Sequence, residues 1–180
     1  MGHEVDIAPV SGGPHDIDAL AEILIEAVAS GGSVSFMHPL SAARARRFWA
    51  ESIAAAGRGE RLVLGARSEG RLVGTVTLDL DLPENQPHRA EIAKLMTRRS
   101  HRGRGIARAM MLEAERLAAE RGRTLLVLDT AAEDGAAGLY EGIGYRMVGT
   151  IPDYALKPHG GLVGTILYFK RIAQTDGACG

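Results

Sequence analysis

Two glycines in a basic segment near the middle of the chain are well placed to bind an anion. Gly103 and Gly105 lie within residues 98–107, between an extended run at 90–97 and a helical run at 106–121. Glycine lets the backbone bend and approach a ligand closely, because it has no Cβ. The first N–H groups of a helix lack internal acceptors and carry the positive end of the helix dipole. The segment therefore predicts a phosphate or pyrophosphate site.

Two carboxylates occupy strand positions where charge is uncommon. Glu91 stands in a run of mostly apolar residues, and Asp129 follows the apolar run at 125–128. Charged residues rarely occupy such positions unless they are paired or functional. The pattern predicts either a role in binding and deprotonating a substrate, or a structural ion pair with Lys94 or an arginine.

Two nucleotide sites fit the glycine-rich turn poorly. A mononucleotide loop requires Lys followed by Ser or Thr after its last glycine, whereas Gly105 is followed by Ile106 and Ala107. A dinucleotide site requires a third small residue, and that position holds Arg108. Because Asp129 stands where a ribose-binding acid would lie, an NAD-dependent oxidoreductase is kept as an alternative.

Hydrophobic periodicity indicates the elements that must position these residues. Alternating or continuous apolar runs predict seven strands, at 4–10, 61–67, 72–80, 90–96, 125–128, 145–151 and 165–170. Apolar residues at helical spacing predict four helices, at 16–28, 41–56, 106–121 and 136–142. We expect Asp16 to cap the first helix and residues 152–164 to form a loop. The order predicts an α/β protein with a mixed central sheet of about seven strands, flanked by about four helices.

Length and composition limit the class of protein. A chain of 180 residues with 46% apolar and 24% charged residues predicts one domain over 1–180, with a loose tail at about 173–180. The formal net charge of −1 argues against nucleic-acid or membrane partners. The first ten residues contain no apolar signal core, so we expect a cytoplasmic protein. The single cysteine, Cys179, lies in the tail and is expected to be incidental.

Two motifs flank the strand predicted at 125–128. Residues 102–107 have the sequence Arg-Gly-Arg-Gly-Ile-Ala, and residues 133–145 contain Leu-Tyr followed by Gly-Tyr. Together they resemble the pyrophosphate loop and second element of the GNAT superfamily of N-acetyltransferases, although Glu133 replaces the usual Asn and Tyr145 the usual Phe. The stretches most similar to the tabtoxin resistance protein type are 32–37, 89–96, 128–130 and 168–170.

This resemblance implies that an acetyl group passes from acetyl-CoA to a primary amine by direct attack, without a metal. The acceptor would be a small molecule, such as an amino-acid-like metabolite, toxin or antibiotic. An amine must be neutral to attack, so one or both of Glu91 and Asp129 are expected to bind the ammonium and take its proton, directly or through water. Tyr140 is expected either to protonate the leaving thiolate or to form a hydrogen bond with it. Phe36 and Met37 are expected to border the acceptor pocket.

The resemblance also implies a coenzyme site on the strand backbone and the turn. The residues expected to bind the coenzyme are Leu95, Met96, Thr97, Arg102, Gly103, Arg104, Gly105, Ile106, Ala107 and Ala136. The protein is expected to be a monomer or a homodimer. Because a fold does not fix an activity, a non-catalytic domain that binds or senses acyl-CoA is kept as a second alternative.

Overall fold

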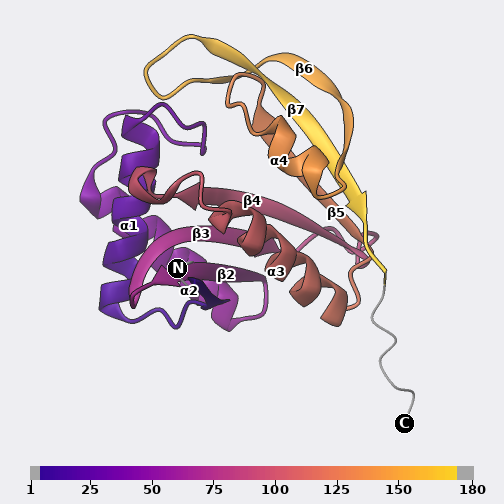
Figure 1. Ribbon diagram of the computed structural model, residues 1–180, viewed down its shortest axis with the longest axis horizontal. Helices are drawn as coiled ribbons and strands as arrows, with labels where there is room; N and C mark the ends of the chain where they lie inside the picture. Colours follow the sequence, from indigo (N-terminus) through magenta and orange to yellow (C-terminus); the bar gives the residue numbers. More distant parts are fainter. Residues whose placement is uncertain (1–4, 174–180) are drawn as a thin grey trace.

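Residues 5–173 are described by a computed structural model, in which seven strands form one mixed sheet (Figure 1). The strands lie in the order β1-β2-β3-β4-β5-β7-β6. Of the neighbouring pairs in this described part, β4 and β5 are parallel and the others are antiparallel. The α/β class and the mixed sheet expected from the sequence are confirmed. The strand bounds are β1 (Val5–Pro9), β2 (Arg61–Ser68), β3 (Arg71–Asp79), β4 (Arg89–Thr97), β5 (Leu125–Ala131), β6 (Arg146–Leu156) and β7 (Leu162–Arg171).

Within residues 5–173, four α-helices cover the two faces of the sheet. Their bounds are α1 (Pro14–Ala29), α2 (Ala42–Gly57), α3 (Ile106–Glu120) and α4 (Ala137–Gly142). Successive strand residues point to opposite faces, so each strand supplies both layers of the core. Val63 packs in the cluster that contains Trp49 of α2, whereas Leu64 packs with Met110 of α3. The helices α1 and α2 therefore cover one face, and α3 covers the other.

The parallel strands β4 and β5 separate after a short paired stretch. Their pairing joins residues 89–91 to residues 125–127. Beyond it β4 contains a bulge, where its register with β3 shifts between Thr75 and Thr77 and Lys94 has a φ of 52°. In Figure 1 the β5-β7-β6 half of the sheet diverges from the β1-to-β4 half. The backbone of β4 after Glu91 therefore lies beyond its pairing with β5.

The first helix begins differently from the prediction. Gly13 is the N-cap of α1 and Pro14 is its first residue, so Asp16 lies inside the first turn. The Asp16 carboxylate instead accepts hydrogen bonds from Arg67, at 2.6 Å, and from Ser11, at 3.0 Å. The cap expectation was wrong because the partner of Asp16 comes from β2, which no local pattern reveals.

The strands near the chain's end are longer than predicted. Residues 152–164 are not one loop: β6 continues to Leu156 and β7 begins at Leu162. A bulge accommodates Pro152, because the β6–β7 register shifts between Ile151 and Ala155 and Asp153 has a φ of 52°. β5 likewise continues to Ala131, so Asp129 lies within the strand rather than at its end.

Two further expectations concern the chain as a whole. Among residues 5–173 no helix is both long enough and apolar enough to span a bilayer. The expected loose tail, with Cys179, falls almost entirely in residues 174–180, which are outside the described residues.

Candidate active site

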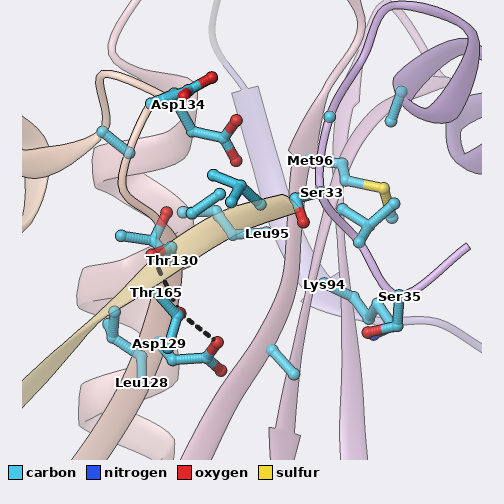
Figure 2. Close-up of a pocket in the computed structure, with 18 of the residues that line it drawn as sticks. Ser33, Ser35, Lys94, Leu95, Met96, Leu128, Asp129, Thr130, Asp134 and Thr165 are labelled. Carbon is cyan, nitrogen blue, oxygen red and sulfur yellow. Dashed lines mark hydrogen bonds between the residues drawn. The ribbon is translucent and has the colours of Figure 1, made fainter. Parts of the chain in front are cut away.

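A pocket of about 650 Å³ lies where β4 and β5 separate (Figure 2). Residues 92–97 of β4 and 128–131 of β5 line it, together with the loop after α1, the loop before α4 and part of the β6–β7 pair. The polar side chains that line it include Ser33, Ser35, Lys94, Asp129, Asp134 and Thr165. A concave site with a few polar groups on an apolar wall is typical of small-molecule binding.

The predicted anion site lies at one end of this pocket. Arg102 and Ala107, on either side of the two glycines, both line it. Gly103 and Gly105 have φ values of 74° and 77°, and Gly105 is the N-cap of α3 without any side-chain cap. A Cβ at either glycine would meet no atom within 4 Å, so the requirement for glycine is conformational. The first N–H groups of α3 remain available to an anion.

Basic side chains surround this helix start. Arg102 donates to the Thr97 carbonyl at 3.2 Å, and Arg104 donates to the Ser100 carbonyl at 3.0 Å, while both side chains remain exposed. Ile106 is buried in the core and anchors the first turn of α3. Cations oppose the dipole at a helix N-terminus, and a bound anion removes that conflict. The residues of the turn therefore fit a pyrophosphate.

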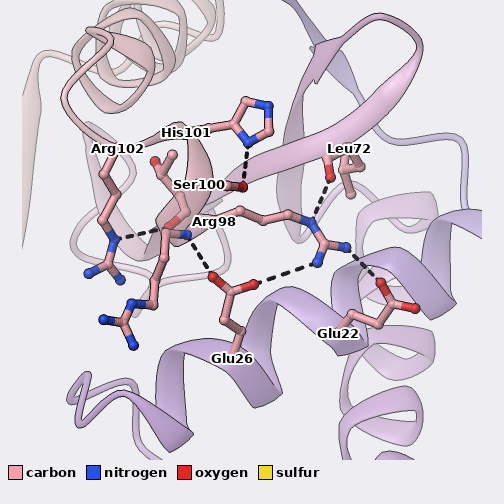
Figure 3. Close-up of polar contacts among 9 residues, drawn as sticks. Glu22, Glu26, Leu72, Arg98, Ser100, His101 and Arg102 are labelled. Atoms are coloured by element: carbon pink, nitrogen blue, oxygen red, sulfur yellow. Dashed lines mark hydrogen bonds and ion pairs between the residues drawn. The ribbon is translucent and has the colours of Figure 1, made fainter.

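The helix α1 holds the entry to the turn in place (Figure 3). The Glu26 carboxylate accepts a 2.6 Å hydrogen bond from the backbone N–H of Arg99, the first residue of the short 3₁₀ helix η1 (Arg99–His101). Arg98 donates to Glu22 at 2.7 Å and to the Leu72 carbonyl at 3.1 Å. The turn is thereby tied both to α1 and to β3.

The strand side of the predicted coenzyme site also faces the pocket. The hydroxyl oxygen of Thr97 is buried and has no hydrogen-bond partner in the described structure. Six of the ten residues predicted to bind coenzyme line the pocket: Leu95, Met96, Thr97, Arg102, Ala107 and Ala136. The other four, which form the turn and its anchor, do not: Gly103, Arg104, Gly105 and Ile106.

The two candidate carboxylates have different surroundings. Asp129 lines the pocket and is exposed there, and its Oδ2 accepts a 2.8 Å hydrogen bond from the Thr165 hydroxyl. Glu91 lies outside the lining and pairs with Arg89, at 2.6 Å. Its side chain is 45% exposed, so solvent can still reach it. The structure brings Asp129, and not Glu91, to the residues of the pocket.

Tyr140 reaches the same pocket from α4. Its side chain is buried, and its ring lies 5.6 Å from that of Tyr168. Burial raises the pKa of Tyr140 to about 12; the hydrogen bond with Thr130 opposes this increase, and the negative charge of Asp134 adds to it. The phenol is therefore protonated at neutral pH, and its role as an acid stays a prediction.

The residues predicted to border the acceptor lie just outside the pocket. Phe36 packs edge-on against Phe48, with ring centroids 5.1 Å apart, and Met37 is 41% exposed. Ser33 and Ser35, earlier in the same loop, line the pocket instead. Sequence reasoning missed these serines and Asp134, because small polar residues in a loop carry no periodic signal. It considered Lys94 only as an ion-pair partner.

Comparison with known proteins identifies a family and several relatives that are similar to this chain. The model of the acetyltransferase (GNAT) family matches residues 24–145. A human relative, N-acetyltransferase 8B, is 36% identical over 86 residues, which are 47% of this chain and 38% of that protein. The chain therefore spans about two fifths of this curated relative's length, and a similar share of N-acetyltransferase 8 from rat.

Solved structures share the whole fold. A ribosomal-protein-alanine N-acetyltransferase from Brucella melitensis matches with a TM-score of 0.79 and 25% identity, over 93% of this chain and 99% of that one. A phosphinothricin acetyltransferase from Sinorhizobium meliloti, in complex with acetyl-CoA, matches with a TM-score of 0.79 and 18% identity, over 97% of this chain and 95% of that one. At that identity the second likeness shows the fold alone.

Proposed function

The chain belongs to the acetyltransferase (GNAT) family, and from that premise we propose that it transfers the acetyl group of acetyl-CoA to a primary amine of a small molecule. One observation carries the proposal: Ala107, in the first turn of the uncapped helix α3, lines the same pocket as Asp129 and Tyr140. A helix start binds phosphate, while a carboxylate and a protonated phenol supply proton transfer. The pocket therefore combines a coenzyme-binding end with a reacting end.

In the proposed mechanism each residue has one task. The first N–H groups of α3 and the nearby arginines hold the pyrophosphate, and the β4 backbone at residues 95–97 binds the pantetheine arm. Acetyl-CoA supplies the acetyl group as an activated thioester. Asp129 binds the acceptor's ammonium and takes one proton, because only the neutral amine attacks. Thr165, which donates to Asp129, keeps that carboxylate oriented.

Bond making and bond breaking then balance without an acyl-enzyme. The amine nitrogen forms a bond to the acetyl carbon as the carbon–sulfur bond breaks, and the electron pair stays on sulfur. Tyr140 donates its phenolic proton to that sulfur, and the proton held by Asp129 restores the phenol through solvent. The acylated nitrogen loses its second proton to solvent, which leaves the neutral amide. Glu91 is the second candidate base, because its exposed carboxylate lies on the strand that lines the pocket.

The acceptor is proposed to be an amino-acid-like metabolite, toxin or antibiotic, so that acetylation would remove a reactive amine and confer resistance. Support comes from the mixed charges of the pocket, with Asp129 and Asp134 on one side and Lys94 on the other. We further propose that the protein acts in the cytoplasm as a monomer or homodimer, and is similar to the tabtoxin resistance protein type.

Thiol release on mixing the protein with acetyl-CoA tests this function. Amines from several classes are supplied in turn, and free coenzyme A and acetylated product are both measured. Turnover that is lost in Asp129→Asn supports the proposal. Coenzyme binding without turnover of any amine would favour a sensing domain, and binding of NAD but not of coenzyme A would favour an oxidoreductase.

A further inference from the structure

Lys94 is a charged residue of the pocket to which the mechanism above gives no role. Its Nζ donates a 3.1 Å hydrogen bond to the Ser35 hydroxyl, the one hydrogen bond that this ammonium makes within residues 5–173. An ammonium has three donors. Figure 2 shows Lys94 and Ser35 on one side of the pocket and Asp129 with Thr165 on the other. A ligand in the pocket therefore meets a cation on one side and an anion on the other.

The contact between these two residues joins two unusual backbone conformations. Ser35 has a φ of 71° and Lys94 a φ of 52°, both in the left-handed region that costs a non-glycine residue about 1 kcal/mol or more. The other two described non-glycine residues with positive φ, Glu69 and Asp153, lie in a hairpin turn and in the β6 bulge. Backbone strain of this kind is common at ligand-binding sites, where a β-bulge changes the direction in which a side chain points.

The charges around Lys94 leave its ammonium only partly compensated. Asp79 already forms an ion pair with Arg61, at 3.1 Å. Burial lowers the pKa of Lys94 below its usual value; Asp79 and Asp129 oppose that decrease, and Arg61 adds to it. The ring of Phe48 lies 5.8 Å from Nζ and offers an aromatic face but no hydrogen-bond acceptor of ordinary strength. An added anion at Nζ would stabilise the protonated form.

We propose that Lys94, supported by the Ser35 hydroxyl, binds a carboxylate carried by the amine acceptor, while Asp129 holds its ammonium. The inference rests on the proposed function and narrows its substrate class to zwitterions, such as α- and β-amino acids and their analogues. Lys94 is then a specificity-determining residue that takes no part in bond making. Polyamines and simple alkylamines lack the anionic group and are poor substrates.

Matched substrate pairs test this assignment. Each pair is an amino acid and its carboxamide, which is nearly the same size but lacks the negative charge. Because the carboxamide's amine is the less basic, it is more often neutral at pH 7, so intrinsic reactivity favours the carboxamide. We expect the wild-type protein to prefer the acid, and Lys94→Met to lower kcat/KM for the acid by about 10- to 100-fold. For the carboxamide the expected change is less than threefold.

Control variants separate a charge effect from a loss of fold. Arg46→Met removes an exposed cation that pairs with Asp18 outside the pocket lining, and it should leave the acid preference unchanged. Lys94→Arg should recover part of the preference, and the melting temperature of each variant is measured alongside. Equal losses for both members of a pair in Lys94→Met would overturn the inference, as would a wild-type preference for the carboxamide.

Ligand-observed NMR distinguishes failure of this inference from failure of the proposed function. If no amine is acetylated, the proposed function fails, but the same pairs can still be tested for binding. Binding of the acid that weakens at least tenfold in Lys94→Met supports the carboxylate site on its own. If the acid does not bind, or binds wild-type and Lys94→Met equally, the carboxylate site is wrong.

Discussion

The Glu26 carboxylate accepts a 2.6 Å hydrogen bond from the backbone N–H of Arg99, and so connects the last turn of α1 to the entry of the glycine-rich turn. A second contact, 3.6 Å from Glu26 to the Arg98 guanidinium, reinforces the link (Figure 3). The turn itself contains two glycines and few internal contacts. Its position relative to β4 therefore depends on a residue more than seventy positions earlier in the chain.

The first prediction concerns this link. Glu26→Ala should raise KM for acetyl-CoA by about 3- to 10-fold with little change in kcat, because misplaced N–H groups weaken coenzyme binding and leave the reacting end intact. Initial rates at varied acetyl-CoA check this. Asp18→Ala is the control, since it removes an exposed ion pair with Arg46 that does not contact the turn and contributes little to stability. An unchanged KM in Glu26→Ala would show that the turn holds itself in place.

The second prediction separates the two candidate bases. Asp129→Asn should lower kcat by about 100-fold or more, because an amide cannot take the ammonium proton. Glu91→Gln should lower it by less than threefold, because its carboxylate pairs with Arg89 outside the pocket lining. Rates at saturating acetyl-CoA measure both. The reverse order would move the base to Glu91, and near-normal rates in both variants would reject a carboxylate base.

The third prediction concerns the acid. Tyr140→Phe should lower kcat at least tenfold and leave KM for acetyl-CoA nearly unchanged, because the ring still fills its place beside Tyr168. Steady-state kinetics with thiol detection provide the measurement, and Tyr145→Phe, which removes a buried hydroxyl outside the pocket lining, is the control. If Tyr140→Phe retains full activity, the thiolate takes its proton from water.

The same residue gives a dependence of stability on pH. The pKa of Tyr140 is raised from 10.0 to about 12 by burial, so the folded protein resists ionisation that the unfolded chain permits. The stability from the neutral phenol is fully present below pH 10 and is lost as the pH rises toward 12. Urea unfolding of Tyr140→Phe should show a shallower loss over this interval than the wild type. Parallel losses would mean that the phenol ionises equally in both states.

The sequence predicted correctly those elements whose ends are determined by residues close by in the chain. Ser41 does cap α2, accepting from the N–H of Arg44, and α3 begins at Ile106 directly after the second glycine. The long β6 strand was missed because its side chains are mostly exposed and its Pro152 is typical of a loop. Only pairing with β7, which comes later in the chain, holds that segment extended.

The sequence likewise predicted one part of the candidate site and missed another. The turn was predicted because its glycines and helix start adjoin one another in sequence. The pocket's other wall was not, because Ser35 and Lys94 are separated by 59 residues and meet only through a β4 bulge. Asp129 and Glu91 appeared equivalent as charges in apolar strands, and only the separation of β4 from β5 distinguishes them.

A further prediction tests the conformational need for glycine in the turn. Gly105→Ala places a Cβ in the left-handed region, which costs about 1–2 kcal/mol, although no atom lies within 4 Å of that Cβ. The turn should relax and KM for acetyl-CoA should rise by several-fold. Gly57→Ala, at a helical residue without positive φ, is the matched control and should be neutral or stabilising. Calorimetry with coenzyme A gives the affinity directly, and equal affinities would contradict the anion site.

The last prediction concerns the ion pair that connects the end of α4, the helix of Tyr140, to α3. Lys170 of β7 donates to the Glu115 carboxylate and to the Ile143 carbonyl, both at 2.6 Å, and so ties the end of α4 to α3. Glu115 is buried, so Lys170→Met leaves a charge without its partner and should cost about 3–5 kcal/mol in the free energy of unfolding. The double variant Glu115→Leu with Lys170→Met removes both charges and should recover most of that loss. Urea unfolding of the four proteins in the cycle measures the coupling, and strictly additive costs would mean that the pair contributes nothing beyond its separate side chains.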